Sequence, residues 1–154
     1  ETEETKTRFA ALVHDLGKGL TPQEMLPHHY GHERTGLDAL TAWNRRMTLP
    51  HDWRKAAAFV IHEHMRAPRL TRPGKIADLL LGIGASGLSI AEFNVIIRAD
   101  HGSLPDYLVH GAEYLAAMRT VTGRSAPPEL SGAEISRWLR EQRVRILKNS
   151  LLEM

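Results

Sequence analysis

The segment Arg8–Gly19 constrains the fold of this chain most strongly. It begins as an apolar helical pattern, reaches an adjacent His14 and Asp15, and continues as Leu-Gly-Lys-Gly. Because glycine commonly ends a helix, residues 5–16 are predicted to form one. Its apolar residues go most of the way round, which is typical of a central, buried helix. An unpaired buried carboxylate is very costly, so the His-Asp pair indicates that both groups bind one cation.

The rest of the chain also follows a helical pattern, without the alternation typical of β-strands. The further predicted helices span residues 33–47, 53–66, 75–83, 89–100, 107–120 and 132–149, with loops at 20–32 and 121–131. Asp52 is a predicted N-cap, and Ser89 with Glu92 forms a predicted capping box. At 154 residues, 42% of them hydrophobic, the chain is long enough for one domain with a real core. The predicted fold class is therefore all-α, a compact bundle forming a single domain over residues 1–154.

Composition excludes several classes of site. The chain has no cysteine, which excludes disulfides, thiolate zinc sites and cysteine nucleophiles. A net charge of +2 is compatible with a nucleic-acid partner but does not require one. No signal peptide opens the sequence and no apolar run approaches the ~18 residues of a membrane span. The chain does not begin with Met and enters a predicted helix almost at once, so we expect a fragment of a longer cytoplasmic protein with no membrane partner.

Helical phase predicts which later polar residues point inward. At about 100° per residue, His64 falls about 20° from Trp53, on the apolar face of its helix. His62 falls about 180° from Trp53 and is predicted to face solvent. By the same test Asp100 lies on an apolar face, whereas Asp78 points away from one and is predicted to be a solvated acid. His64 and Asp100 are therefore the inward candidates for a cation site.

Three histidines in five residues precede the second predicted helix, and the last of them is His32. His32 is placed to point back at the His-Asp pair, although a solvent-exposed position at the helix start is the alternative. The predicted site gathers His14, Asp15, His32, His64 and Asp100 from four segments. Imidazole with carboxylate suits Mn, Fe, Ni, Co, Zn or Mg. Such a cation polarises a phosphate oxygen and lowers the pKa of a bound water, and Lys18 is placed to hold a phosphate or balance charge.

These residues carry a resemblance to a known family. The strings RFAALVHDLGKG, TPQEMLPHHYGHE, VIHEHM and RADHGS, with the final helix from Ser131, resemble the HD domain of bacterial multifunctional tRNA nucleotidyltransferases, the CCA-adding enzymes. The resemblance implies an HD-type bundle with phosphohydrolase activity on 2′,3′-cyclic phosphates, 2′-nucleotides and other phosphate esters. It implies a divalent metal, either Ni, Mn, Co or Mg, and a role in tRNA 3′-end maturation and repair. The implied partner is tRNA or a nucleotide phosphate ester.

The matching motifs also imply roles for individual residues. The resemblance implies metal ligands at His14, Asp15, His32, His64 and Asp100, and catalytic roles for Asp15, Lys18, His32 and Glu33. Two departures stand out. The family usually supplies another metal histidine upstream of the pair, where this sequence has no residue before Glu1. His101-Gly102-Ser103 follows Asp100, where relatives often carry a small or apolar residue and then an arginine.

Alternatives remain open for the function. In the family this domain follows a nucleotidyltransferase head, which this sequence lacks. One alternative is a non-catalytic HD domain that binds tRNA or forms a homodimer, and another is a stand-alone HD nucleotidase. The basic residues of the final helix are either a solvated face or a contact for RNA phosphates: Arg137, Arg140, Arg143, Arg145 and Lys148.

Overall fold

The structure is a computed structural model that describes residues 2–152. Within these residues all regular structure is helical, which confirms the all-α fold class. The α-helices are α1 (Thr2–Val13), α2 (His32–Arg46), α3 (His51–Glu63), α4 (Pro73–Ser86), α5 (Ile90–His101), α6 (Asp106–Val109), α7 (Gly111–Arg119) and α8 (Gly132–Leu152). Short 3₁₀ turns occupy Leu16–Leu20, Gln23–Met25, Ala67–Arg69 and Gly123–Ser125.

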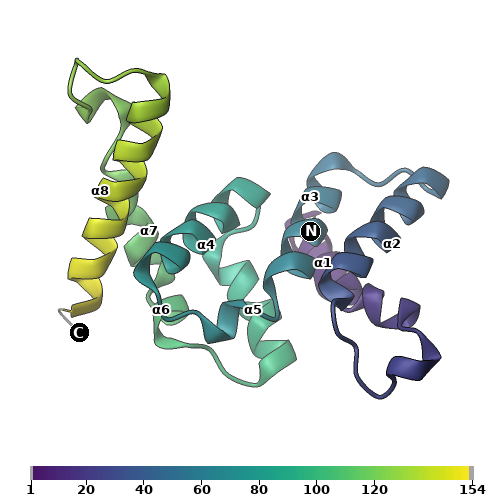
Figure 1. Cartoon of the computed structure of the whole chain (residues 1–154). Helices are drawn as coiled ribbons and strands as arrows, with labels where there is room; N and C mark the ends of the chain where they lie inside the picture. The colour runs from purple at the N-terminus through teal and green to yellow at the C-terminus, as the bar shows by residue number, and fades with distance from the viewer. Residues whose placement is uncertain (1, 153–154) are drawn as a thin grey trace.

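The helices form two neighbouring groups around a continuous core (Figure 1). In the first group α3 packs against both α1 and α2, and in the second α8 packs against α4 and α7. Small residues allow the close approach of α1 to α3, since Ala10, Ala56 and Ala57 are fully buried. Contacts of α3 with α4 and of α1 with α5 join the two groups. The end of α1 therefore lies near both later helix ends that carry predicted ligands.

The first helix has the predicted length, but it begins and ends three residues earlier than predicted and is more exposed than its sequence pattern predicts. It ends at Val13, so His14 and Asp15 lie in a turn after the helix. Leu12, which the prediction of a central, buried helix placed among the apolar residues, is 77% exposed, so that prediction was wrong for this face. The apolar pattern reports what a helix can bury, whereas burial also needs a second element to cover that face.

Other boundaries differ in detail. The predicted helix 107–120 is broken at His110 into α6 and α7, and α8 continues three residues beyond the predicted end, to Leu152. The N-cap of α3 is Pro50, so the prediction of Asp52 was wrong; Asp52 lies in the first turn, where its charge favours the helix dipole. The capping box of Ser89 with Glu92 is confirmed.

The apolar faces of α4 and α5 are buried as predicted, with Leu80, Ile83, Phe93 and Ile97 fully inaccessible. No single helix in the described part of the chain is long and apolar enough to cross a membrane. The pair α4 and α5, bent by 110°, passes that test together by length and composition only.

A close contact between Gly17 and α2 fixes the turn that carries the His-Asp pair. A Cβ atom on Gly17 would lie 2.0 Å from the carbonyl oxygen of His32 and 2.5 Å from the amide nitrogen of Gly36. Both atoms are backbone and cannot rotate away. Glycine at this position therefore lets the turn approach the start of α2 closely enough to share one site with His32.

We expect Gly17→Ala to lower the free energy of unfolding by about 3 kcal/mol or more, because the added methyl group must displace backbone. Urea unfolding followed by circular dichroism measures this change. Gly19→Ala is the matched control, since a Cβ atom there meets nothing within 4 Å. Equal stability of the two variants would contradict the close contact.

Candidate metal centre

Asp15 lies at the centre of a cluster drawn from separate segments. Its Oδ1 atom is 3.3 Å from His32 Nε2 and 3.5 Å from His64 Nε2. Its Oδ2 atom is 3.2 Å from His14 Nε2. Asp100, near the end of α5, places Oδ1 3.3 Å from the same His14 nitrogen. The five side chains of the predicted cation site are thus brought together, and their role as ligands remains a prediction.

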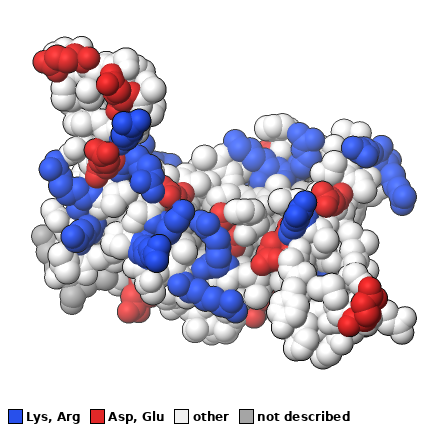
Figure 2. All heavy atoms as spheres, viewed as in Figure 1, with Lys and Arg blue, Asp and Glu red and all other residues white. Residues whose placement is uncertain are grey.

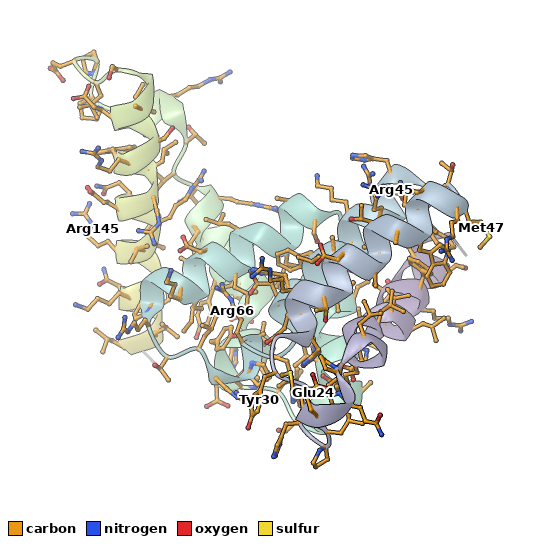
Figure 3. The ribbon with its side chains drawn as sticks, turned by 45° about the vertical axis from the view of Figure 1, so that its right-hand side comes forward. Glu24, Tyr30, Arg45, Met47, Arg66 and Arg145 are labelled. Carbon is orange, nitrogen blue, oxygen red and sulfur yellow. The ribbon has the colours of Figure 1, made fainter. Side chains whose placement is uncertain are left out.

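Each part of the site is positioned by the local end of a helix. Gly31, with a φ of 76°, adopts the left-handed conformation that glycine tolerates best, and α2 then begins at His32. His64 is the C-cap residue of α3 and is fully buried, while the side chain of neighbouring His62 is 57% exposed. Both orientations confirm the prediction from helical phase. Figure 3 shows Glu24 and Tyr30 on the segment that joins α1 to α2.

Backbone carbonyls fix the orientation of the three imidazole rings. Nδ1 lies 2.6 Å from the Ala11 carbonyl in His14, 2.8 Å from the His29 carbonyl in His32 and 3.0 Å from the Ile61 carbonyl in His64. Each Nδ1 therefore carries the proton and donates it, which leaves Nε2 of a neutral ring with a free lone pair. All three Nε2 atoms face Asp15. Histidine ligands of metals are commonly held in this way by their other nitrogen.

The cluster leaves polar atoms without ordinary partners. His14 Nε2 and Asp15 Oδ1 are buried and have no hydrogen-bond partner among the described residues. The Nε2 atoms of His32 and His64 lie 3.2 Å apart, although neither has a proton to donate in the tautomers set by their carbonyls. Buried polar atoms are rarely left unsatisfied, and nitrogen lone pairs that face each other repel. Three of these residues, His14, Asp15 and His64, also place ligand atoms within 4.8 Å of one another. The residues present therefore fit a divalent cation.

Electrostatics keep two of the proposed ligands, Asp15 and His64, in their binding forms. Burial raises the pKa of Asp15, but the hydrogen bond from Lys18 and the charges around it outweigh burial and hold that pKa below its usual value. The Lys18 Nζ atom lies 2.5 Å from Asp15 Oδ2. Burial lowers the pKa of His64, and the nearby His14 lowers it further. Asp15 is therefore ionised and His64 neutral at neutral pH, as metal binding requires.

The pKa of His64 predicts how stability depends on pH. Without metal, we expect the free energy of unfolding to fall between about pH 7 and pH 5. The unfolded chain binds a proton at an ordinary histidine pKa, whereas folded His64 resists protonation, so stability is present above that pKa and lost below it. Denaturant unfolding across this range measures the slope. His64→Leu should flatten it and His62→Ala should not; an unchanged slope in His64→Leu would contradict the assignment.

Two acids considered in the sequence analysis, Glu33 and Asp78, lie outside the cluster around Asp15. Glu33 lines a separate pocket of about 480 Å³ with Arg34, His62 and Arg66. Asp78 points away from the core as predicted, but it is paired rather than simply solvated. Both of its carboxylate oxygens accept hydrogen bonds from Arg140, at 3.0 and 2.9 Å, because α8 packs over that side of α4.

Sequence reasoning missed two charged or polar groups beside the site. Glu63 is only 7% exposed and pairs with both Arg66 and His62. The spacing of three residues between Glu63 and Arg66 on a helix was the available signal. His101 Nε2 lies 3.0 Å from Asp100 Oδ2 and 3.1 Å from the His64 carbonyl oxygen. Nothing in the local pattern indicated that His101 contacts two segments at once.

Comparisons with known proteins agree with this geometry. The HD domain family matches residues 1–118. The chain is similar to the Multifunctional CCA protein of Pseudoalteromonas atlantica, at 31% identity over 94% of this chain and 38% of that protein. It is also similar to the proteins of that name from Cupriavidus metallidurans, at 49% identity over 46% of this chain and 17% of the relative, and from Legionella pneumophila, at 43% over 54% and 21%.

The chain spans less than two fifths of each of these relatives. No solved structure matches it significantly. The family match covers the His-Asp pair, the Gly-His-Glu segment, His64 and Asp100 together. The chain therefore belongs to the HD domain family.

Proposed function

We propose that this protein is a metal-dependent phosphohydrolase domain that cleaves phosphate esters of nucleotides, 2′,3′-cyclic phosphates above all. The observation that carries the proposal is the convergence of three Nε2 atoms and two carboxylates, with His14 Nε2 and Asp15 Oδ1 buried and unsatisfied. A purely structural cluster would be expected to pair these atoms. The family membership supports the same class of chemistry.

The residues of the proposed site divide into those that would hold the cation and those that would bind the substrate. His14, Asp15, His32, His64 and Asp100 would hold the cation. When bound, such a cation polarises a phosphate oxygen and lowers the pKa of a bound water. Lys18 pairs with Asp15 and is 40% exposed, so its ammonium group is placed to bind a phosphate oxygen of the substrate. The catalytic role that the resemblance implies for Glu33 stays a prediction, and in the structure Glu33 lines a separate pocket with Arg34, His62 and Arg66.

The basic surface supports tRNA, or another RNA 3′ end, as the proposed partner. Arg66, Arg69, Arg72 and Lys75 lie between His64 and Ala77, and no carboxylate occurs in that interval. Figure 2 shows Lys and Arg side chains gathered over the middle of this face and along α8. Arg145 projects outward from α8 (Figure 3). Arg140, on the same helix, is engaged by Asp78. Arg66 pairs with Glu63, but the basic residues of this surface outnumber the acids beside them, and such an excess of positive charge attracts the phosphate backbone of nucleic acids.

The test is hydrolysis by the purified chain after removal of metal with EDTA. Mn²⁺, Ni²⁺, Co²⁺ or Mg²⁺ is then added, with 2′,3′-cyclic AMP, 2′-AMP or a short RNA ending in a 2′,3′-cyclic phosphate as substrate. We expect turnover with at least one of these metals, loss of turnover in Asp15→Asn, and faster cleavage of the RNA at low salt. Bound metal without any turnover would contradict the proposal and favour a non-catalytic tRNA-binding domain.

A further inference from the structure

His101 is the last residue of α5 and follows the proposed ligand Asp100. Its Nε2 atom contacts two groups at once, Asp100 Oδ2 at 3.0 Å and the backbone carbonyl oxygen of His64 at 3.1 Å. The carbonyl oxygen can only accept, so this nitrogen must carry a proton, which it donates to the His64 carbonyl while lying close to the Asp100 carboxylate. A lone pair on Nε2 is therefore not available to a cation.

The two carboxylate oxygens of Asp100 face different neighbours. Oδ2 lies 3.0 Å from the Nε2 atom of His101, while Oδ1 lies 3.3 Å from His14 Nε2, on the side of the proposed metal centre. A terminal carboxylate torsion is broad and easily rotated. A fixed donor on Oδ2 limits that rotation and keeps Oδ1 turned toward the other ligands.

The same proton also ties together two helix ends. The His64 carbonyl lies just past the last turn of α3, where backbone carbonyls lack helical partners. His101 supplies a donor to it across 37 positions of sequence. The His101 side chain thus connects the end of α3, beside His64, with the end of α5, beside Asp100.

We propose that His101 is a positioning residue that presets Asp100 for metal binding. The proposal rests on the metal centre argued above and adds a determinant of its affinity. Partners that hold metal ligands by a hydrogen bond typically contribute about 10- to 100-fold to metal affinity. The donor function of His101, rather than its ring or its charge, is what the geometry uses.

The experiment measures Mn²⁺ binding to the whole chain from the electron paramagnetic resonance signal of free Mn²⁺. His101→Phe keeps a flat ring and removes the donor, while His101→Gln keeps a donor of similar reach. We expect affinity about tenfold weaker in His101→Phe and restored to within about threefold in His101→Gln. In a third comparison, His101→Phe is added to Asp100→Ala, and we expect no further loss of Mn²⁺ affinity.

The outcomes separate this inference from the proposed function. A wild-type chain that binds no Mn²⁺ at all would overturn the metal centre itself. If His101→Phe binds Mn²⁺ as tightly as the wild-type chain, only the role of His101 is overturned. His101→Gln as weak as His101→Phe would show that a hydrogen-bond donor at this position does not restore metal binding, and would also overturn the role of His101. A further loss on adding His101→Phe to Asp100→Ala would show that His101 does not act through Asp100.

Discussion

Replacing Asp15 with asparagine is expected to lower metal affinity by more than about 100-fold and to abolish metal-dependent hydrolysis. This loss should exceed what substitution of an outer partner costs, because the Asp15 carboxylate contacts the Nε2 atoms of His14, His32 and His64. Asparagine keeps the shape but loses the charge that a divalent cation needs. Isothermal titration with Mn²⁺ measures the affinity, and circular dichroism checks that the variant stays folded.

Asp78→Asn is the matched control for Asp15. Its carboxylate is partly exposed and engages Arg140 on α8, away from the cluster. We expect unchanged metal affinity and at most a small loss of stability, as is usual for an exposed ion pair. Equal metal binding by Asp15→Asn and wild type would show that this cluster is not the metal centre.

The second large effect is expected from His64→Ala. Its side chain is fully buried, and its Nε2 atom faces Asp15 at 3.5 Å. The substitution removes a proposed ligand and leaves a cavity, so metal affinity should fall by more than about 100-fold. The free energy of unfolding should fall by about 2–3 kcal/mol.

His62→Ala provides the comparison two residues away on the same element. The His62 side chain is 57% exposed and contacts Glu63. We expect stability within about 0.5 kcal/mol of wild type and unchanged metal affinity. Titration with Mn²⁺ and urea unfolding test both variants together. A loss of affinity in His62→Ala as large as that in His64→Ala would contradict the orientation on which the site depends.

Residues inside regular helices were predictable because their orientation is a local property. Once α3 is recognised, the angle between successive side chains decides that His64 is buried and His62 exposed. The same test placed Asp100 on the side of the cluster, and the structure puts its Oδ1 atom 3.3 Å from His14 Nε2, although the residue remains partly exposed at the end of α5. Helical phase therefore identified two members of the cluster without any knowledge of the tertiary structure.

Features that depend on distant segments were harder to predict. Leu12 matches an apolar stripe yet stays exposed, since no described element covers that face. The close contact of Gly17 with His32 and Gly36 is set by the path of a turn, which periodicity does not describe. The bond from His101 to the His64 carbonyl joins two helix ends and leaves no trace in local sequence. The helix start places His32 against Asp15, while its neighbour Glu33 lines a separate pocket, and its role stays a prediction.

Anomalous diffraction from crystals grown with Mn²⁺ would test the central claim most directly, because it locates the cation without assuming a reaction. We expect a peak within coordination distance of His14 Nε2, His64 Nε2 and an Asp15 oxygen, with Asp100 Oδ1 on its other side. A peak beside Glu33 or Glu63 instead would contradict this assignment. So would crystals grown at saturating Mn²⁺ that show no peak in the cluster.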